Sequence, residues 1–261
     1  MRIAHRPHRS RRAYLSAGFP EAWRAIVASR LAAWSTLGED ERVRLEQLVL
    51  GLIADVRWSA ANGFELTEEV MVTVAAPAAL LVLGEGLGIG CFSNVTSIEV
   101  HASTIFVRGE QHTGLPGGLM FDGVSALAGR ADYRGPVFVA WDQVLRDARH
   151  PLSGHNVVLH EFAHVLDMLD GVVDGTPPLP STEMARWVEV CLAEFEALRT
   201  GGGDDLLDDY AATDPGEFFA VATEVFFGRP VALHERKPAL YAVLAGFYRQ
   251  DPAARVPNAA R

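Results

Sequence analysis

The sequence predicts an α+β fold, mostly helical, with a small mixed or antiparallel sheet. Long segments with apolar residues at helical spacing fill the first third and the C-terminal half of the chain. Three short runs of β-branched and aromatic residues lie between these segments, and glycine-rich or proline-rich stretches separate the elements. With 261 residues, 49% of them hydrophobic, the chain can bury a full core.

The first third reads as three helices, over residues 20–31, 38–59 and 67–83. Thr67 is suited to cap the third helix, because Glu68 and Glu69 follow it in the first turn. The run VMVTVAAPAALLVL, residues 70–83, is apolar but shorter than the ~20 residues that span a membrane. We expect a core helix that is broken at Pro77 or starts there.

The middle of the chain is expected to form the sheet. GEGLGIG, residues 84–90, ends the helical pattern, and its glycines do not match the GxGxxG of a dinucleotide site, so we expect a loop. Strand-like runs follow at residues 97–100, 104–107 and 136–141, with a glycine-rich region at 109–135 between the last two.

The C-terminal half is expected to be helical again. Helices are predicted over residues 156–169, ending at Gly171, over 182–198, and in a final block at 217–228 and 238–249. Between them, the run TGGGDD at residues 200–205 is expected to be the most flexible internal segment, with the glycines at its centre.

Composition and charge exclude several classes of protein. The formal net charge of −10 argues against a nucleic-acid partner, which requires a basic face. The first residues are locally basic, and SRRAYL at residues 10–15 is similar to a twin-arginine export signal, but Pro20, Glu21 and Arg24 stand where an apolar segment should follow. Two cysteines without a CxxC pair offer no disulfide framework. We therefore expect a cytoplasmic protein without a membrane segment.

The stretch HEFAH within NVVLHEFAHVLDMLD, residues 156–170, carries the chemistry. In a helix, His160 and His164 lie four residues apart on one face, so that both imidazoles can bind one tetrahedral zinc ion. Glu161 lies one step around the helix, where its carboxylate can accept a proton from the attacking water. The alternative is a buried helix without a metal, but the apolar flanks would make two unpaired histidines and a glutamate costly.

A catalytic zinc ion needs a third protein ligand, and the sequence leaves three candidates. HExxHxxGxxH is not matched, since both Gly and the last His are replaced by Asp. Asp167 shares the stripe of the histidines, but it is better placed to hold a histidine N–H or a neighbouring backbone group. In DPGEFFAVATE, Glu217 and Glu224 are seven residues apart on one face, among apolar neighbours where a carboxylate needs a cation. Glu217 at the helix start, or Glu224, is the expected third ligand.

Tyr210 lies seven residues before Glu217, in DDYAATDPGE. A phenol near the metal can donate a hydrogen bond to the oxyanion that forms when water attacks an amide carbonyl. Spacing alone would equally fit an aromatic residue at a helix boundary.

These motifs resemble the Mlc titration factor A family of bacterial zinc-dependent peptidases, whose active-site domain is similar to that of anthrax lethal factor and related gluzincins. The likeness rests on NVVLHEFAHVLDMLDG, residues 156–171, and DYAATDPGEFFAVATEVFF, residues 209–227, and extends more weakly along most of the chain. The sequence departs from the expected pattern at Asp214, where Asn is expected, and at Gly216.

The resemblance implies a gluzincin-like zinc metallopeptidase core with aminopeptidase-like activity on peptides. It implies that His160, His164 and Glu217 bind one Zn²⁺, that Glu161 is the general base and that Tyr210 assists at the oxyanion. We expect a basic tail at residues 1–15 and a single domain at 16–261, helical at about 16–90 and with the catalytic core at about 91–261. The alternative function is a regulatory protein that sequesters a transcriptional repressor of sugar uptake, and a weaker one is a hydrolase of non-peptide amides.

Overall fold

The fold is given by a computed structural model that describes residues 18–103, 135–201 and 206–256, and the strand assignments between residues 105 and 131. The expected tail at 1–15, most of the glycine-rich region and Gly202–Asp205 lie outside the described residues. The helices are α2 (Glu21–Arg30), α3 (Glu39–Asp55), α4 (Glu68–Leu81), α5 (Trp141–Arg149), α6 (Val157–Asp167), α7 (Ser181–Gly201), α8 (Pro215–Gly228), α9 (Pro230–Arg236), α10 (Pro238–Tyr248) and α11 (Pro252–Arg255).

Short 3₁₀ helices and strands complete the fold. The 3₁₀ helices are η1 (Ala32–Thr36), η2 (Ile89–Phe92), η3 (Met168–Asp170) and η4 (Asp209–Ala212). The strands are β1 (Arg57–Ala60), β2 (Ser97–His101), β3 (Ile105–Arg108), β4 (Gln111–His112), β5 (Met120–Phe121), β6 (Val124–Leu127), β7 (Gly129–Ala131) and β8 (Pro136–Ala140). The predicted α+β class is confirmed.

The main sheet is mixed, with strand order β1-β2-β8-β7. β1, β2 and β8 are parallel, and β7 is antiparallel to β8 at the end of the sheet. Helix α4 forms the crossover between β1 and β2 that a parallel pair requires. Ile98 pairs with Trp58 on one side and Val137 on the other, and Ile98, Val100, Val137 and Val139 are all buried. Apolar alternation therefore fixes the register of the sheet.

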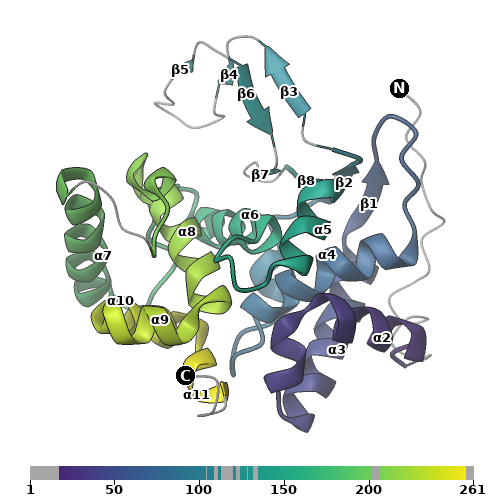
Figure 1. The fold of residues 1–261 in the computed structure, drawn as a ribbon, viewed down its shortest axis with the longest axis horizontal. Helices are drawn as coiled ribbons and strands as arrows, with labels where there is room; N and C mark the ends of the chain where they lie inside the picture. The colour runs from purple at the N-terminus through teal and green to yellow at the C-terminus, as the bar shows by residue number, and fades with distance from the viewer. Residues whose placement is uncertain are drawn as a thin grey trace.

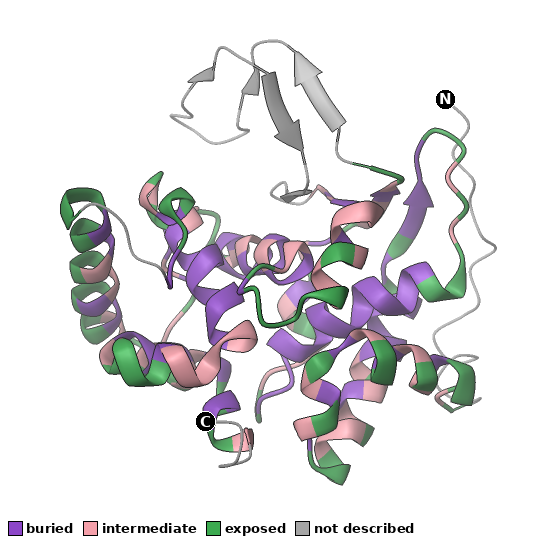
Figure 2. Cartoon of the chain, in the orientation of Figure 1, coloured by how far each residue is buried: buried purple, intermediate pink, exposed green. Residues whose placement is uncertain are grey.

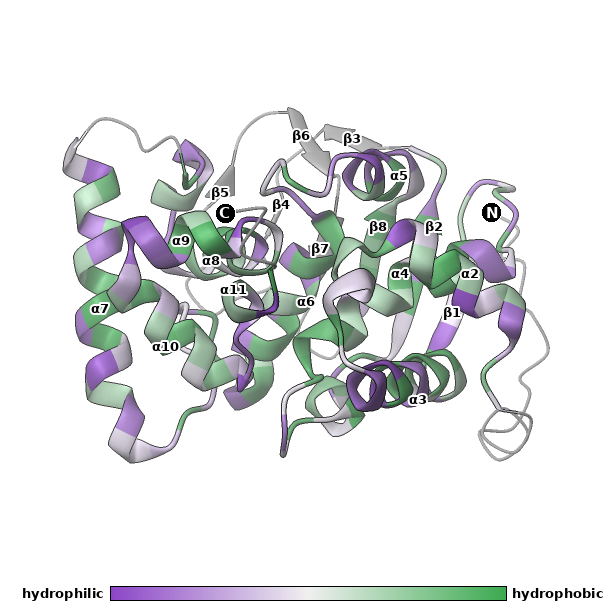
Figure 3. Ribbon diagram, turned by 60° about the horizontal axis from the view of Figure 1, so that its bottom comes forward, coloured by the Kyte–Doolittle hydropathy of each residue, from purple (hydrophilic) through white to green (hydrophobic). Residues whose placement is uncertain are grey.

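Helix α6 lies in the middle of the molecule, between α2 and α3 on one side and α7, α9 and α10 on the other (Figure 1). Burial is densest along α4, α6 and α8, while α3 and α7 expose one face (Figure 2). Helix α3 buries Leu45, Val49 and Leu52 at helical spacing and presents polar residues outward (Figure 3). The site therefore rests on the most buried helices.

Two expectations about the N-terminal helices were wrong. The helix predicted over residues 38–59 ends at Asp55, and Arg57–Ala60 form β1, because the backbone of these four residues pairs with β2. Helix α4 neither breaks nor starts at Pro77 but runs through it. An interior proline costs a helix ~3 kcal/mol, and in α4 every residue from Val70 to Leu81 is buried, which offsets that cost.

The other predicted helices are confirmed with small shifts of their ends. Thr67 caps α4, and its hydroxyl accepts a hydrogen bond from the Val70 amide at 3.3 Å. Gly171 ends the α6–η3 segment in the left-handed conformation, with φ of 93°. Cys91 and Cys191 are free thiols. No helix in the described part of the chain is both long and apolar enough to cross a membrane.

Candidate metal centre

Helix α6 begins at a fully supported N-terminus. The Asn156 side chain accepts hydrogen bonds from the amides of Val158 and Leu159, at 3.1 and 3.0 Å. The amide of Val157 donates to the Asp147 carboxylate, which is supplied by α5, at 2.8 Å. Amide groups in the first turn of a helix have no partners within the helix, so these contacts fix where α6 starts.

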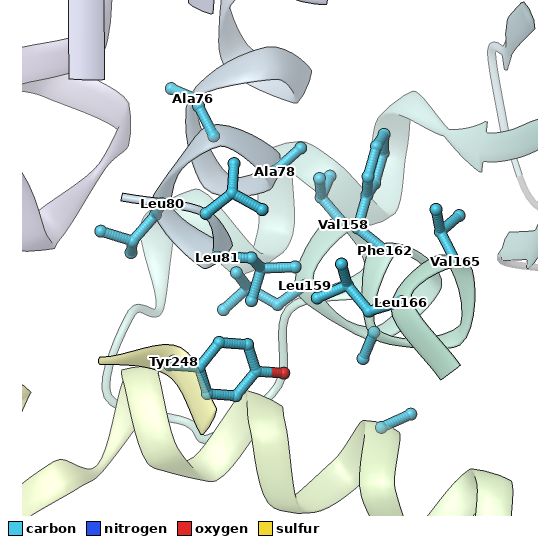
Figure 4. Packing of buried hydrophobic residues seen from close by; sticks show 14 of the residues in the cluster. Ala76, Ala78, Leu80, Leu81, Val158, Leu159, Phe162, Val165, Leu166 and Tyr248 are labelled. Atoms are coloured by element: carbon cyan, nitrogen blue, oxygen red, sulfur yellow. The ribbon is translucent and has the colours of Figure 1, made fainter. Parts of the chain in front are cut away.

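The two faces of α6 have different roles. Val158, Leu159, Phe162, Val165 and Leu166 repeat at helical spacing and are buried, in a cluster that includes Leu80 and Leu81 of α4 (Figure 4). Positions 160 and 164 lie on the opposite face, which α8 packs against. Packing against α4 therefore determines which way the two imidazoles point.

Helix α8 also has a defined start. Pro215 occupies its first turn, and the Asp214 carboxylate accepts a hydrogen bond from the Glu217 amide at 3.0 Å. At Gly216, an added Cβ would lie 3.0 Å from a Val173 methyl group, so a small residue suits this close approach. Both departures from the family pattern thus fit the local structure, and Asp214 serves as a cap.

The structure brings together the side chains of His160, His164 and Glu217, whose candidate ligand atoms all lie within 4.8 Å of one another. The two Nε2 atoms are 3.2 Å apart, and Glu217 Oε2 lies 3.0 Å from His160 Nε2 and 3.5 Å from His164 Nε2. Ligands held tetrahedrally at about 2.0–2.2 Å from zinc would be about 3.3–3.6 Å apart. The donor set and its spacing therefore fit a zinc ion.

Glu224 and Asp167, the rival candidates, lie elsewhere. Glu224 Oε1 is 2.8 Å from His160 Nδ1, the nitrogen that faces away from the cluster, and Oε2 accepts a hydrogen bond from the Asn156 amide. Asp167 is fully buried and accepts a hydrogen bond from the Gly175 amide at 3.0 Å. Glu224 thus fixes the orientation of the His160 imidazole, an arrangement like that in which carboxylates orient metal-binding histidines.

Hydrogen bonds within the cluster shift the pKa values of His160 and Glu217 in opposite directions. Burial disfavours the charged form of His160, but hydrogen bonds to Glu217 and Glu224 outweigh it, so its pKa lies well above the usual value. Burial likewise disfavours the Glu217 carboxylate, yet its contacts with His160 and His164 bring its pKa well below the usual range. Both shifts follow from the close approach of the His160 imidazole to the Glu217 and Glu224 carboxylates, at 3.0 and 2.8 Å.

Glu161 is buried beside the histidines, with only 4% of its surface exposed. Its Oε2 has no hydrogen-bond partner among the described residues. Burial raises the pKa of Glu161 to about 7, although both neighbouring histidines act to lower it. A carboxylate with a pKa near neutrality can both accept and return a proton.

Tyr210 lies in η4, whose start is held by a 2.8 Å hydrogen bond from the Tyr210 amide to Asp208. Its ring centroid is 6.2 Å from that of His160, while about half of the residue's surface is exposed. Partial burial and the nearby Glu217 carboxylate raise the pKa of Tyr210 above its usual value. The phenol therefore stays protonated and can act as a donor.

Sequence reasoning missed Asp147 and Asn156, which support the start of α6. Asn156 had a readable signal, since Asn directly before an apolar helical run is a common cap. Asp147 had none, because its contact with Val157 depends on how the loop at residues 150–155 turns back.

The fold and the site define a mostly helical protein with a His-His-Glu group suited to a metal ion. The family model described as glucose-regulated metallo-peptidase M90 matches residues 5–249. The chain belongs to this metallopeptidase family.

Related proteins can be aligned with this chain over most of their length. Mlc titration factor A of Edwardsiella ictaluri (strain 93-146) is 37% identical over 240 residues, which covers 90% of this chain and 89% of that protein. Mlc titration factor A of Serratia proteamaculans (strain 568) is 34% identical, with 90% and 88% covered. The uncharacterized protein slr2042 of Synechocystis is 34% identical, with 89% and 85% covered. The resemblance to the Mlc titration factor A family is thus confirmed.

Proposed function

We propose that this protein is a zinc-dependent peptidase of the gluzincin type, with aminopeptidase-like action on peptides in the cytoplasm. One observation carries the proposal. Two imidazoles from α6 and one carboxylate from α8 converge with separations of 3.0, 3.2 and 3.5 Å, close to those of tetrahedral zinc ligands. Membership in a metallopeptidase family supports the same reading.

His160, His164 and Glu217 would hold the ion, with Glu224 fixing the ring of His160 from behind. When bound, zinc supplies Lewis acidity, which polarises the carbonyl and lowers the pKa of water. The Glu161 carboxylate accepts the proton of the attacking water and then returns it to the departing amine. The Tyr210 hydroxyl donates a hydrogen bond to the oxyanion.

A strand edge is a natural guide for a peptide backbone. Strand β2 has no free edge for this role, because it is paired on both sides, with β1 and β8. Strand β7 lies at the end of the sheet order, and α6 contacts it. We therefore assign the backbone-pairing edge to β7.

The decisive test is Glu161→Gln, which keeps the size of the side chain but removes the base. The variant should bind one zinc ion per chain, as wild type does, and lose turnover of short peptides by roughly 10²–10⁴-fold, the usual contribution of a general base. Metal content by mass spectrometry and peptide cleavage by chromatography measure the two properties. Unchanged turnover would show that Glu161 is not the general base. A wild-type protein that stays metal-free after zinc is added would contradict the proposal of a zinc-dependent enzyme.

A second function is favoured by the name of the relatives, Mlc titration factor A. Under this alternative the chain sequesters a transcriptional repressor, and hydrolysis is incidental or controlled. With Glu161→Gln as bait, capture of an intact repressor would support binding. Recovery of cleaved repressor with wild type alone would support the peptidase.

A further inference from the structure

The loop between η3 and α7, residues 171–180, meets the start of α8 at Gly175. Gly175 is buried and has a φ of +75°. A Cβ added to it would lie 2.2 Å from the carbonyl oxygen of Pro215, which is a backbone atom. Rotation of a side chain cannot relieve such a contact, so only glycine lets the two backbones approach this closely.

A second glycine, Gly216, faces the same loop from the side of α8. A Cβ added to it would lie 3.0 Å from a Val173 methyl group and 3.6 Å from Oδ2 of Asp167. Together these contacts form a backbone seam, made by residues 173–175 of the loop and residues 215–216 of α8. Glu217, the carboxylate of the candidate metal centre, directly follows this seam.

Gly175 is held in the seam by hydrogen bonds to two other helices. Its amide donates to Oδ2 of Asp167 at 3.0 Å, and its carbonyl oxygen accepts from Nε1 of Trp187 at 3.0 Å. Asp167 lies on α6, three residues after His164, and Trp187 lies on α7 with its ring packed against Phe219 of α8. All of these groups except His164 are buried, and buried backbone groups need partners. The two bonds therefore fix where the loop lies.

The seam sets the position of α8 relative to α6. Glu217 Oε2 lies 3.0 Å from Nε2 of His160 and 3.5 Å from Nε2 of His164, and zinc sites tolerate changes of only about 0.2 Å in ligand distance. A Cβ at position 175 has to move the loop and Pro215 apart by more than this to reach even 3.0 Å. Because the loop is bonded to α6, such a movement displaces the start of α8 from the two histidines.

We propose that Gly175 is a positioning residue of the metal centre, which acts through the backbone seam to hold Glu217 against His160 and His164. The proposal rests on the proposed metal-dependent function. The alternative is that Gly175 only supports the fold, through its positive φ, and has no specific effect on the metal.

The test compares the full chain carrying Gly175→Ala with a matched control, Gly63→Ala. Gly63 follows β1 and has a φ of +79°, but an added Cβ would meet no atom of the described residues within 4 Å. Both substitutions impose the strain of a positive φ, and only Gly175→Ala adds a contact with Pro215. Zinc affinity is measured by competition with a chromogenic chelator, and stability by urea unfolding with excess chelator.

Gly175→Ala should bind zinc about 10–100-fold more weakly than wild type, the usual effect of losing a group that orients a metal ligand. Gly63→Ala should lose stability and keep the zinc affinity of wild type. In a Glu217→Gln background, Gly175→Ala should weaken zinc binding by less than about 2-fold, because the residue through which it acts is already lost.

An equal loss of affinity in both backgrounds, or a loss no larger than that of Gly63→Ala, would overturn the positioning role. Zinc binding that depends on Gly175, in a wild type that cleaves no peptide, would retain that role and overturn the peptidase. If Gly175→Ala does not fold, Trp187→Phe decides, since it removes one hydrogen bond to Gly175 and keeps an aromatic ring. It should weaken zinc binding by roughly 2–10-fold, as for one lost hydrogen bond, and an unchanged affinity would overturn the proposal.

Discussion

At the scale of single residues, His160 is the best-constrained side chain of the site. Its Nδ1 lies 2.8 Å from Glu224 and its Nε2 lies 3.0 Å from Glu217, so both ring nitrogens face carboxylate oxygens. Glu224 is bonded at both oxygens, to the imidazole and to the Asn156 amide. Glutamine has a single carbonyl oxygen and cannot satisfy both donors.

Glu224→Gln should therefore weaken zinc binding by about 10–100-fold, the usual effect of removing a carboxylate that orients a metal-binding histidine. Competition with a chromogenic chelator measures the affinity. Glu235→Gln, an exposed acid on α9, is the control and should leave the affinity as in wild type. An unchanged affinity in Glu224→Gln would mean that its contact with His160 does not organise the site.

The two carboxylates around the His160 imidazole also predict how many protons are released when zinc binds. Without a metal, each His160 ring nitrogen needs a proton to donate a hydrogen bond to its carboxylate partner. The hydrogen bonds to Glu217 and Glu224 outweigh the effect of burial, so the pKa of His160 lies well above its usual value. Since a metal takes the place of the Nε2 proton, zinc binding near pH 7 should release about one proton, and affinity should fall as the pH falls.

Calorimetry in buffers of different ionisation enthalpy measures this release as the slope of the observed heat against buffer enthalpy. A slope of zero at neutral pH would show that His160 is already neutral before the metal arrives. Glu217→Gln gives a comparison in which one of the two carboxylates no longer favours the charged ring.

At the scale of elements, a titratable carboxylate joins the end of α5 to the start of α6, because Asp147 accepts a hydrogen bond from the Val157 amide. Burial raises the pKa of Asp147 to about 6, and the nearby Glu224 charge adds to this rise. The hydrogen bond from the Val157 amide and the charges of His155 and Arg146 act in the opposite direction but do not outweigh burial. Because the folded-state pKa exceeds the unfolded value near 3.9, the folded state binds this proton more tightly. Stability from Asp147 is therefore complete below about pH 4 and is lost as the pH rises through about 6.

Asp147→Asn keeps an oxygen acceptor for the Val157 amide and removes the ionisation. The free energy of unfolding of the variant should equal that of wild type near pH 4 and exceed it by ~1–2 kcal/mol above pH 7. This value is reduced from that of a full two-unit pKa shift because the group is only partly buried. Urea unfolding with chelator present measures this at intervals from pH 4 to 8. Asp40→Asn, at an exposed position on α3, should show no such step, and a flat difference for Asp147→Asn would contradict the assignment.

Secondary structure was predictable from the sequence where one periodic apolar pattern ran unbroken. It was poorly predictable where hydrogen bonding to a distant strand determined the backbone conformation. The apolar spacing of residues 158–166 and the cap at Thr67 are local signals, and both appear in the structure. Strand β1 follows α3 after a single residue and owes its form to pairing with β2, which is distant in sequence. The tolerance of Pro77 depends on burial around all of α4, which local propensity does not register.

The same division holds for the site. The pair His160 and His164 is readable because both lie on one helix, and Glu217 is readable as a carboxylate in an apolar helix. The choice between Glu217 and Glu224 depends on how α6 and α8 pack against each other. Long-range packing of this kind leaves no trace in local spacing.

At the scale of the whole molecule, the metal centre ties together distant parts of the chain. The buried core runs from Trp23 to Ala253, and α4 from the N-terminal part backs the helix that carries both histidines. The carboxylate comes from α8, more than fifty residues later in the sequence. A bound ion would thus link α6 and α8, and any ligand that binds the folded state alone adds to its stability.

Zinc at about 1,000 times its dissociation constant should stabilise the fold by ~4 kcal/mol. For a chain of this size, that corresponds to a rise in Tm of roughly 8–16 °C. Thermal unfolding with zinc, with chelator, and with zinc restored after chelation measures the shift and its reversibility. Glu217→Gln should lose most of the rise, because the link between α6 and α8 is broken while the two histidines remain. An equal rise in the variant would show that the ion is held by α6 alone, and that the second helix has no part in the centre.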